Sequence, residues 1–367
     1  MKILEVTYLS INSDPRAKKF ADTLSQTNDV TVLDLGDSKV LPGYKVVSKK
    51  KLKNPIMSIF VFWLSIFKNA VRIKPDVIIA HNYYNVFPVW IISLLVGAKR
   101  VYDSYEIYIP SRTQKLNKRS YFFYLLEKVS ITHYPVIFSA NMERSRLMKA
   151  KFNLKRLPIP VLNISNSINA SDLSKEDLNN KYPDLKGFLD NGKIIVYQGY
   201  MSIGRDIDKY LDILKLLPDS FKLLYIGDGP DLQLIRNKIT ELNISDRALA
   251  LGRVQMNDVV PFVRNCSYGL VTYHFKDYNN RYCSPNKIFE YSLAHLPFIS
   301  SRQSTIINIM KEVDYVCYIN ISDFERAANA IVKFDSEYCK NESVFYSFNS
   351  KYNWENEKQK ILKAFEN

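Results

Sequence analysis

The sequence predicts an α/β fold of two Rossmann-like domains, each with a doubly wound parallel sheet. Three observations predict it. The chain has 367 residues, more than a single hydrophobic core usually holds. Short apolar runs alternate with helical segments in both halves, as expected of strands joined by crossover helices. Between the halves, residues 163–191 are rich in Asn, Ser, Asp and Lys, which is typical of a linker. We therefore expect domains at 1–165 and 166–350.

The first half contains five apolar runs that predict strands, most of them followed by helical patterns. The strands are expected at 3–9, 30–35, 76–80, 99–102 and 135–139, with helices at 15–26, 55–68, 86–96 and from Asn141. Asp14 before Pro15 is a helix start signal, because aspartate caps a helix and proline suits its first turn. Arg16 is unexpected there, since a cation opposes the helix dipole. Either a ligand anion lies nearby, or Arg16 is exposed and has no role.

Polar side chains follow two of these predicted strands. His81 follows the run 76–80, and Asp103, Tyr105 and Glu106 follow the run 99–102. In parallel sheets the functional residues lie past the carboxyl ends of the strands. Each residue alone is as readily explained as a cap on a strand end, but their shared edge favours a site.

The second half repeats the alternation, with strands expected at 193–197, 221–226, 249–254, 268–273 and from Leu296. Gly199 and Gly204 follow the first of these strands and Gly227 follows the second. Glycine allows the backbone to approach a ligand closely. Arg205, at the entrance of the next helix, is suited to a bidentate phosphate contact.

The strand 268–273 leads through a polar loop, 274–281, into a helix that begins near Pro285. A helix N-terminus binds anions through its free N–H groups and dipole, and Lys287 adds a positive charge. Glu290, one turn later, is placed to accept hydrogen bonds from a ribose, as acidic residues do in dinucleotide folds. The alternative is an ordinary surface pair of Lys287 and Glu290 at i,i+3.

The segment Ser284-Pro285-Asn286-Lys287-Ile288-Phe289-Glu290-Tyr291, followed by His295-Leu296-Pro297, resembles the nucleotide-sugar site of the GT4 group of glycosyltransferases, which have the GT-B fold. That family usually carries two glutamates with seven residues between them. Glu290 matches the second. Tyr282 stands at the first, whose glutamate touches the donor sugar in the family. The resemblance covers nearly the whole chain and is most specific in 193–300.

The family also commonly has an Asp-x-His-Glu segment in its first domain. Asp103 and Glu106 match it, whereas Tyr105 stands where the histidine would be. A tyrosine does not accept protons near neutral pH without a large pKa shift, so we expect Tyr105 only to position the substrate.

The resemblance implies two domains facing across a cleft, with a closing helix in 351–367 that packs back on the first domain. It implies a retaining glycosyltransferase (a hexosyltransferase) that needs no metal or other cofactor. Such an enzyme would move a sugar from a nucleotide-diphospho-sugar to a lipid-linked or polysaccharide acceptor in cell-surface glycan biosynthesis.

Three groups of site residues follow from the residue patterns and the resemblance together. The catalytic group is Arg205, Lys287, Glu290, Tyr105, Glu106 and Asp103. The donor-binding group is Gly199, Gly204, Arg205, Gly227, Arg253, Val254, Ser284, Pro285, Asn286, Lys287 and Glu290. The acceptor-binding group is Asn12, Asp14, Arg16, His81 and Tyr105. Fixed cations near the departing diphosphate would supply most of the catalytic effect.

Two alternative functions remain open. A sugar-nucleotide epimerase can share this architecture, and would need acid and base groups, for which Asp103, Glu106 and His81 are the candidates. A non-catalytic partner of another glycosyltransferase is the second alternative, because Tyr282 and Tyr105 both depart from the family motifs.

Charge and cysteine usage restrict the partners and the compartment. Residues 1–165 hold 26 Lys+Arg and 11 Asp+Glu, a balance of +15; subtraction from the chain totals of 51 and 37 leaves 25 and 26, a balance of −1. This asymmetry predicts a polyanionic partner for the first domain. We expect an anionic membrane rather than nucleic acid, since no nucleic-acid-binding motif is present.

The expected location is the cytoplasm, at the inner face of the membrane. The four cysteines lack metal-ligand spacing and do not form a disulfide framework. The N-terminus enters a strand directly and does not resemble a signal peptide.

The apolar run within 55–68 has about 13 residues, against the ~20 that span a bilayer. One hypothesis is a buried helix of the first domain. The other is a helix that lies in the membrane interface, with the basic segment 49–53 on anionic head groups.

Overall fold

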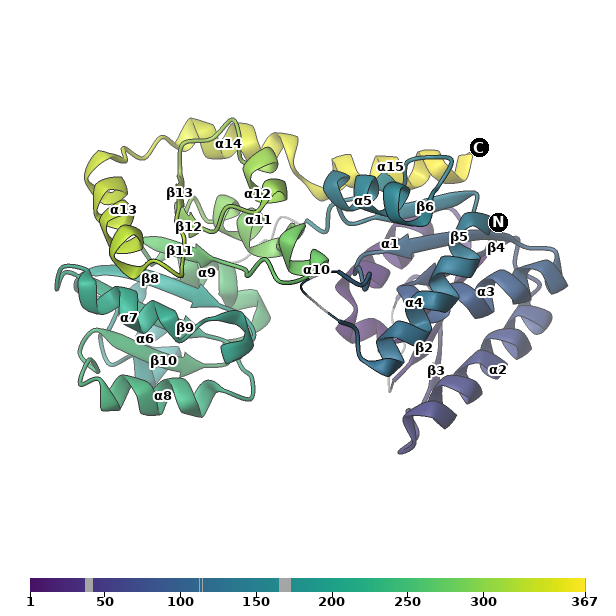
Figure 1. The fold of residues 1–367 in the computed structure, drawn as a ribbon, viewed down its shortest axis with the longest axis horizontal. Helices are drawn as coiled ribbons and strands as arrows, with labels where there is room; N and C mark the ends of the chain where they lie inside the picture. The colour runs from purple at the N-terminus through teal and green to yellow at the C-terminus, as the bar shows by residue number, and fades with distance from the viewer. Residues whose placement is uncertain (37–41, 112, 114, 165–172, 367) are drawn as a thin grey trace. The chain divides into compact units, whose positions relative to one another are not determined.

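The computed structural model describes residues 1–36, 42–111, 113, 115–164 and 173–366. The chain forms two compact units (Figure 1). The first consists of Met1–Asn163, Asp277–Tyr282 and Glu355–Asn367, and the second of Ile164–Lys276 and Cys283–Trp354. The expected boundary between 165 and 166 falls on residues outside the described ones.

The first unit is built on a parallel seven-stranded sheet with the strand order β3-β2-β1-β4-β5-β6-β7. Its strands are β1 Lys2–Thr7, β2 Asp29–Leu35, β3 Lys45–Lys49, β4 Val77–His81, β5 Lys99–Ser104, β6 Val136–Ser139 and β7 Ile159–Pro160. The order changes direction between β1 and β4, as in doubly wound folds, where the carboxyl ends of these strands border the ligand crevice. The central strands are fully buried because both faces of such a sheet are covered.

Among the helices of the first unit, α3 packs against both α2 and α4. The short helical turns are η1 Ile11–Ser13 and η2 Ile131–His133, and the helices are α1 Pro15–Leu24, α2 Pro55–Ile73, α3 Tyr83–Val96, α4 Lys118–Ser130, α5 Met142–Phe152, α10 Tyr278–Arg281 and α15 Trp354–Glu366. Asp14 caps α1 by accepting from the Ala17 N–H, as the sequence predicts. Helix α2 has 19 residues and extends beyond the 13-residue apolar run. The run ends earlier than the helix because Lys68 and Arg72 lie in the last turns of α2.

The second unit has a parallel six-stranded sheet with the order β10-β9-β8-β11-β12-β13. Its strands are β8 Lys193–Gln198, β9 Phe221–Ile226, β10 Ala248–Gly252, β11 Tyr268–Val271, β12 Phe298–Ser300 and β13 Val316–Tyr318. Its helices are α6 Lys175–Lys181, α7 Lys209–Leu216, α8 Leu232–Glu241, α9 Val259–Arg264, α11 Asn286–Leu293, α12 Ser304–Ile309, α13 Phe324–Glu337 and α14 Glu342–Lys351, with short turns η3 Pro183–Leu185, η4 Ile203–Arg205 and η5 Met256–Asp258. The change of direction lies between β8 and β11.

The structure describes only part of the segment 163–191, which the sequence predicts to be a linker. Residues 165–172 lie outside the described part of the chain, but 173–191 contains α6 and η3. Leu178 and Leu185 are buried in the second unit, and a capping box of Ser174 and Asp177 starts α6. The linker prediction is therefore wrong for 173–191, because a few well-placed apolar residues dock this polar segment.

The polar loop expected at 274–281 contributes a helical turn, α10, to the first unit. Arg144 holds it there, with Nε donating to the Tyr282 carbonyl at 3.0 Å and Nη2 donating to the Asn279 carbonyl at 2.7 Å. The Asn141 side chain also donates to the Tyr282 carbonyl, at 2.9 Å. The Tyr282 backbone, at the position of the family's first glutamate, is thus fixed by side chains of α5 and its cap.

Candidate functional site

A cavity of about 730 Å³ opens at the carboxyl ends of β8, β9 and β10 in the second unit. Its lining residues are Tyr182, Gln198, Gly199, Ile226, Gly227, Arg253, Val254, Gln255, Val259, Lys287 and Glu290. Six of them are among the donor-binding residues that the sequence predicts. A cavity of this size at the strand switch point of an α/β sheet suits a ligand with the dimensions of a nucleotide.

Two glycines shape one wall of the cavity. Gly227 has a φ of +135°, and a Cβ there would lie 1.9 Å from the carbonyl oxygen of Gly199. Gly199, with a φ of +130°, donates its N–H to the Ile226 carbonyl at 2.9 Å. Both positions favour glycine because the backbone is in a conformation that other residues rarely adopt, and at Gly227 the added Cβ would also overlap the Gly199 backbone. The ends of β8 and β9 therefore pack together, and their backbone atoms line the cavity.

Lys287 lies in the first turn of α11 and extends over Gly199. Its Nζ is 4.3 Å from the centroid of the Tyr197 ring, and a Cβ on Gly199 would lie 3.2 Å from that nitrogen. Burial, together with the smaller effect of the positive charge of Arg205, lowers the pKa of Lys287 to about 7. No side chain caps the N-terminus of α11. The cavity thus has an ammonium group and free helix N–H groups, which together favour an anion.

Glu290 lies one turn beyond Lys287 and forms a hydrogen bond with Gln198, the last residue of β8. The Gln198 amide Nε2 donates to the Glu290 carboxylate. The other amide atom, Gln198 Oε1, is buried and has no hydrogen-bond partner among the described residues. A buried acceptor without a partner is unfavourable unless a ligand supplies the donor. Gln198 was not predicted as a site residue, although it directly follows a predicted strand.

Five other predicted donor-binding residues do not line the cavity. Arg205 is exposed, with its guanidinium 5.3 Å from the centroid of the Tyr200 ring, and it acts on the site through its charge, which lowers the pKa of Lys287. Gly204 is exposed, and a Cβ there would meet nothing nearer than the Ser202 hydroxyl at 3.5 Å, so the geometry does not require glycine. The remaining three precede Lys287 and are half-buried: Ser284, Pro285 and Asn286.

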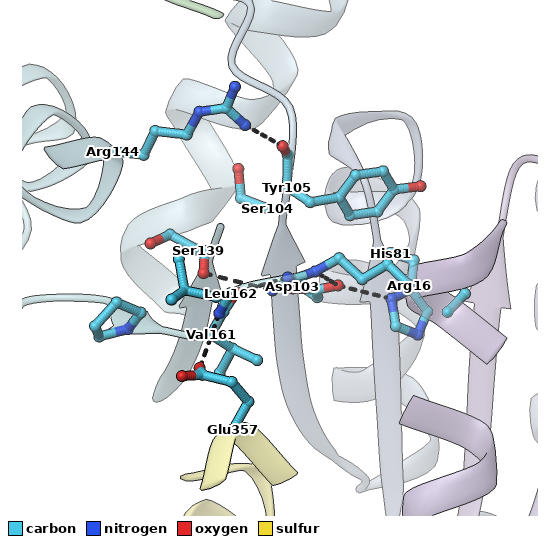
Figure 2. Close-up of polar contacts among 12 residues, drawn as sticks. Arg16, His81, Asp103, Ser104, Tyr105, Ser139, Arg144, Val161, Leu162 and Glu357 are labelled. Atoms are coloured by element: carbon cyan, nitrogen blue, oxygen red, sulfur yellow. Dashed lines mark hydrogen bonds and ion pairs between the residues drawn. The ribbon is translucent and has the colours of Figure 1, made fainter. Parts of the chain in front are cut away.

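At the strand ends of the first unit, Asp103 joins two cations (Figure 2). The Arg16 guanidinium donates to the Asp103 carboxylate through Nε and Nη2, at 2.7 to 3.0 Å, and to the Val161 carbonyl at 2.7 Å. His81 Nδ1 lies 3.1 Å from Asp103 Oδ2, and its Nε2 lies 2.9 Å from Glu5 Oε2. All four side chains are buried. The sequence predicts either an anion near Arg16 or an exposed Arg16. The structure shows that Arg16 is buried and that the anion is Asp103, not a ligand.

The pKa shifts in this network follow from its alternating charges. Burial alone would lower the pKa of His81, but its hydrogen bonds with Asp103 and Glu5 raise it to about 10. Burial raises the pKa of Glu5 and the imidazolium opposes that rise; we place the shared proton on His81 because it lies between two carboxylates. The stabilisation by the imidazolium is complete below pH 6.5, the ordinary pKa, and is lost as the pH rises towards 10.

These contacts correct several predicted roles. His81, Arg16 and Asp103 have almost no exposed surface and satisfy one another, so they shape the strand ends and do not touch an acceptor. Asp14 is equally buried and accepts from Thr7, Ala17 and Tyr105.

Three predicted residues of the first unit keep accessible atoms. Asn12 is exposed on η1, and Tyr105 and Glu106 are half-buried. The Tyr105 hydroxyl donates to Asp14 at 2.7 Å, and burial raises its pKa well above the ordinary value. Tyr105 therefore stays neutral, in agreement with a positioning role. Arg144 donates to the Tyr105 carbonyl (Figure 2).

We expect replacement of Asp103 by asparagine to destabilise the protein by about 3–5 kcal/mol, because Arg16 would be left as a buried cation without a carboxylate and His81 would keep only Glu5. Chemical denaturation with two spectroscopic probes measures the loss. Asp184→Asn is the control: this exposed aspartate should change stability by less than about 0.5 kcal/mol. Equal effects of the two variants would contradict the assignment of the charges.

No His, Cys, Asp and Glu cluster suited to a metal occurs in the described ranges.

The sequence matches no family model and no curated protein. The structure is similar to that of HepE from Anabaena in complex with UDP, with a TM-score of 0.76, 15% identity and 100% of both chains covered. It is similar to sucrose-phosphate synthase from Thermosynechococcus elongatus, with a TM-score of 0.78, 12% identity and coverage of 100% and 98%.

A third similar structure is a putative UDP-N-acetylglucosamine 2-epimerase from Listeria monocytogenes, with a TM-score of 0.65, 11% identity and coverage of 99% and 95%. At these identities the comparisons establish the fold. The two parallel-sheet α/β units and the full coverage of both chains show that this protein has the GT-B fold, the fold of one large class of glycosyltransferases.

Proposed function

We propose that this chain is a glycosyltransferase that takes its sugar from a nucleotide-diphospho-sugar bound in the cavity of the second unit. The observation that carries the proposal is Lys287, held at an uncapped helix N-terminus over the glycine wall of a nucleotide-sized cavity. Phosphate groups suit this arrangement, because it offers a cation and backbone donors side by side. The UDP complex of the similar structure of HepE supports UDP as the first nucleotide to test.

In the proposed site the diphosphate lies against Lys287 and the N-terminus of α11, while the ribose lies at Glu290. Gln198 Oε1 accepts a hydrogen bond from the nucleoside or sugar, which would satisfy that buried oxygen. The wall formed by Arg253, Val254 and Gln255 borders the base. As the sugar leaves, charge develops on the diphosphate, and fixed donors aimed at that charge lower the barrier.

The finer features of the proposal come from the resemblance to GT4 enzymes. They are retention of the anomeric configuration, transfer without a metal, and a lipid-linked or polysaccharide acceptor for cell-surface glycans made at the cytoplasmic side of the membrane. Tyr105, Glu106 and Asn12 are the predicted first-unit residues with atoms free to meet an acceptor.

The structure favours a transferase over an epimerase, because most candidate acid and base groups of the first unit are buried. An epimerase needs acid and base groups that reach the sugar, and two of its three candidates, His81 and Asp103, are buried in ion pairs. Incubation with donor alone separates the two activities, since only an epimerase changes its substrate without an acceptor. A non-catalytic partner would bind donor and turn over none of it with any acceptor extract.

A thermal-shift panel of nucleotide sugars tests donor binding directly. A ligand at 100 times its Kd stabilises the folded protein by ~2.7 kcal/mol, so the matching donor should raise the melting temperature by several degrees. We expect Gln198→Leu to reduce this shift, while Gln233→Leu, a change at an exposed glutamine on α8, leaves it unchanged. If no nucleotide sugar shifts the melting temperature, the proposal fails.

Donor affinity should fall as the pH rises above 7. The free ammonium of Lys287 has a pKa of about 7, and a bound diphosphate raises that pKa because it favours the charged form. Above pH 7 binding must take up a proton, so affinity falls by up to about tenfold per pH unit; below pH 7 this group adds no dependence. Calorimetry at pH 6.5, 7.5 and 8.5 measures the slope. Lys287→Arg, which stays charged, should flatten it, and a flat profile in the unmodified protein would contradict the assignment.

A further inference from the structure

Helix α2 of the first unit exposes many apolar residues, while its buried side mixes apolar with polar residues. Its buried side includes Ser58, Ser65 and Asn69, and Ser65 and Asn69 bond to carbonyl groups of the helix itself. The exposed side carries Ile56, Met57, Phe60, Val61, Leu64, Phe67 and Val71, which are 37–77% exposed. An ordinary surface helix carries polar or charged residues on its exposed side, whereas these seven exposed residues of α2 are apolar.

The exposed apolar surface extends over two further helices. Helix α3 packs against both α2 and α4, and Figure 1 shows the three helices together in the first unit. Helix α3 has no charged residue and exposes Ile91, Leu94 and Leu95. Helix α4 exposes Tyr121, Phe122, Leu125 and Val129. We call these residues, with those of α2, the α2–α4 face. An apolar surface of this extent marks an interaction site.

The charges around the α2–α4 face are positive. Residues 42–75 contain eight Lys and Arg and no Asp or Glu. They are Lys45, Lys49, Lys50, Lys51, Lys53, Lys68, Arg72 and Lys74. On α4, Lys118, Arg119 and Lys128 are exposed, whereas the single acid, Glu127, is buried and bonds to the Tyr102 hydroxyl. The rim of the face therefore complements a negatively charged surface.

We propose that the α2–α4 face docks on an anionic lipid bilayer, with its apolar residues in the interface and the basic rim on the head groups. Apolar residues flanked by lysines are the features of helices that lie in the membrane interface. By length and composition α2 is the one described helix that could cross a membrane. It lies on the membrane and does not span it, because Phe62, Ile66 and Ala70 pack into the core of the first unit.

Vesicle flotation of the full chain tests the proposal and needs no donor or acceptor, so its result is independent of the proposed transferase activity. We expect the protein to float with vesicles of phosphatidylcholine containing 30% phosphatidylglycerol, and to remain at the bottom with phosphatidylcholine alone. Each cation near an anionic surface contributes about fivefold to the partition coefficient, so the combined changes Lys49→Gln, Lys50→Gln, Lys51→Gln and Lys53→Gln should reduce binding at least tenfold.

One variant of the α2–α4 face and two control variants separate binding through this face from general surface effects. The double change Phe60→Ser and Leu64→Ser, at exposed positions of α2, should reduce flotation at least tenfold and keep the melting temperature. The control pair Leu234→Ser and Tyr346→Ser removes equally exposed apolar residues from α8 and α14 and should float normally. A charge control replaces Lys175, Lys311, Lys333 and Lys340, exposed lysines of the second unit, with glutamine and should also float normally.

Four results would overturn the proposal. They are absence of flotation, equal flotation with neutral vesicles, loss of binding in the control variants to the same degree, and retention in the membrane after alkaline extraction, which indicates a spanning helix. Dimers that dissociate in the Phe60→Ser and Leu64→Ser variant, without any vesicle binding, would assign the face to a second copy of the chain instead.

Discussion

Replacing Lys287 with alanine should remove the donor-induced thermal shift and lower donor affinity by about 30- to 150-fold. A hydrogen bond to a charged group contributes about 2–3 kcal/mol, which corresponds to that range of affinity. The side chain is the cation that lines the cavity at the N-terminus of α11, and in the free protein burial keeps its pKa at about 7. Its removal should even stabilise the free protein slightly, because a poorly solvated cation is lost.

Calorimetric titration with a nucleoside diphosphate measures this change in affinity. Lys333→Ala is the control, since this lysine is exposed on α13 and does not line the cavity. The rate of sugar transfer should fall by a larger factor than the donor affinity, because the charge on the departing diphosphate grows in the transition state. An unchanged affinity in Lys287→Ala would place the diphosphate elsewhere.

Replacing Gly227 with alanine should cost about 3–5 kcal/mol of stability and abolish donor binding. The residue has a φ of +135°, and the new Cβ would lie 1.9 Å from the Gly199 carbonyl oxygen and 3.0 Å from the Gly199 nitrogen. The strained backbone conformation and the overlap each cost about 1–3 kcal/mol. Relief of the overlap must separate the ends of β8 and β9, which form the glycine wall of the cavity.

Gly204→Ala is the matched control for this effect. Its Cβ would meet only the Ser202 hydroxyl, at an ordinary contact distance of 3.5 Å. We expect normal stability and donor binding, or a small gain in stability from the reduced freedom of the unfolded chain. Denaturant unfolding and the thermal-shift assay measure both variants. A stable, donor-binding Gly227→Ala would show that the two glycines do not define the site.

Much of the second unit could be predicted from the sequence because its signals are local. Apolar runs mark β8, β9 and β11, and the residues that follow them along the chain, Gly199 and Gly227, lie in the cavity wall. Lys287 and Glu290 share one short helix, so their common position follows from helical periodicity alone. Gln198 was missed because its unpaired oxygen becomes visible only when its partner, Glu290, is placed 92 residues away.

The first unit was harder to predict because its site is organised by long-range ion pairs. Asp103 pairs with Arg16 across 87 residues, and Arg144 bonds to Tyr282 across 138. Sequence patterns report local preference and do not report such pairings, so Arg16 was expected to be exposed or next to a ligand. Strands β3 and β7 were also missed. One is a half-exposed edge strand and the other has two residues, and neither has a clear apolar period.

The structure shows which side of helix α2 is exposed, and the apolar run within 55–68 does not predict this. The run was expected to be a buried helix of the first domain or an interfacial helix. The structure buries only 28% of the most apolar 18-residue stretch of α2. Composition alone does not tell which side of an apolar helix faces the core, because both sides of α2 carry apolar residues.

A crystal structure of the protein soaked with UDP tests whether the cavity of the second unit is the donor site. We expect both phosphates at the N-terminus of α11, with at least one oxygen within 3.2 Å of Lys287 Nζ, a normal hydrogen-bond distance, and the ribose hydroxyls on Glu290. Phosphates bound at the strand ends of the first unit, or anywhere out of reach of Lys287, would contradict it.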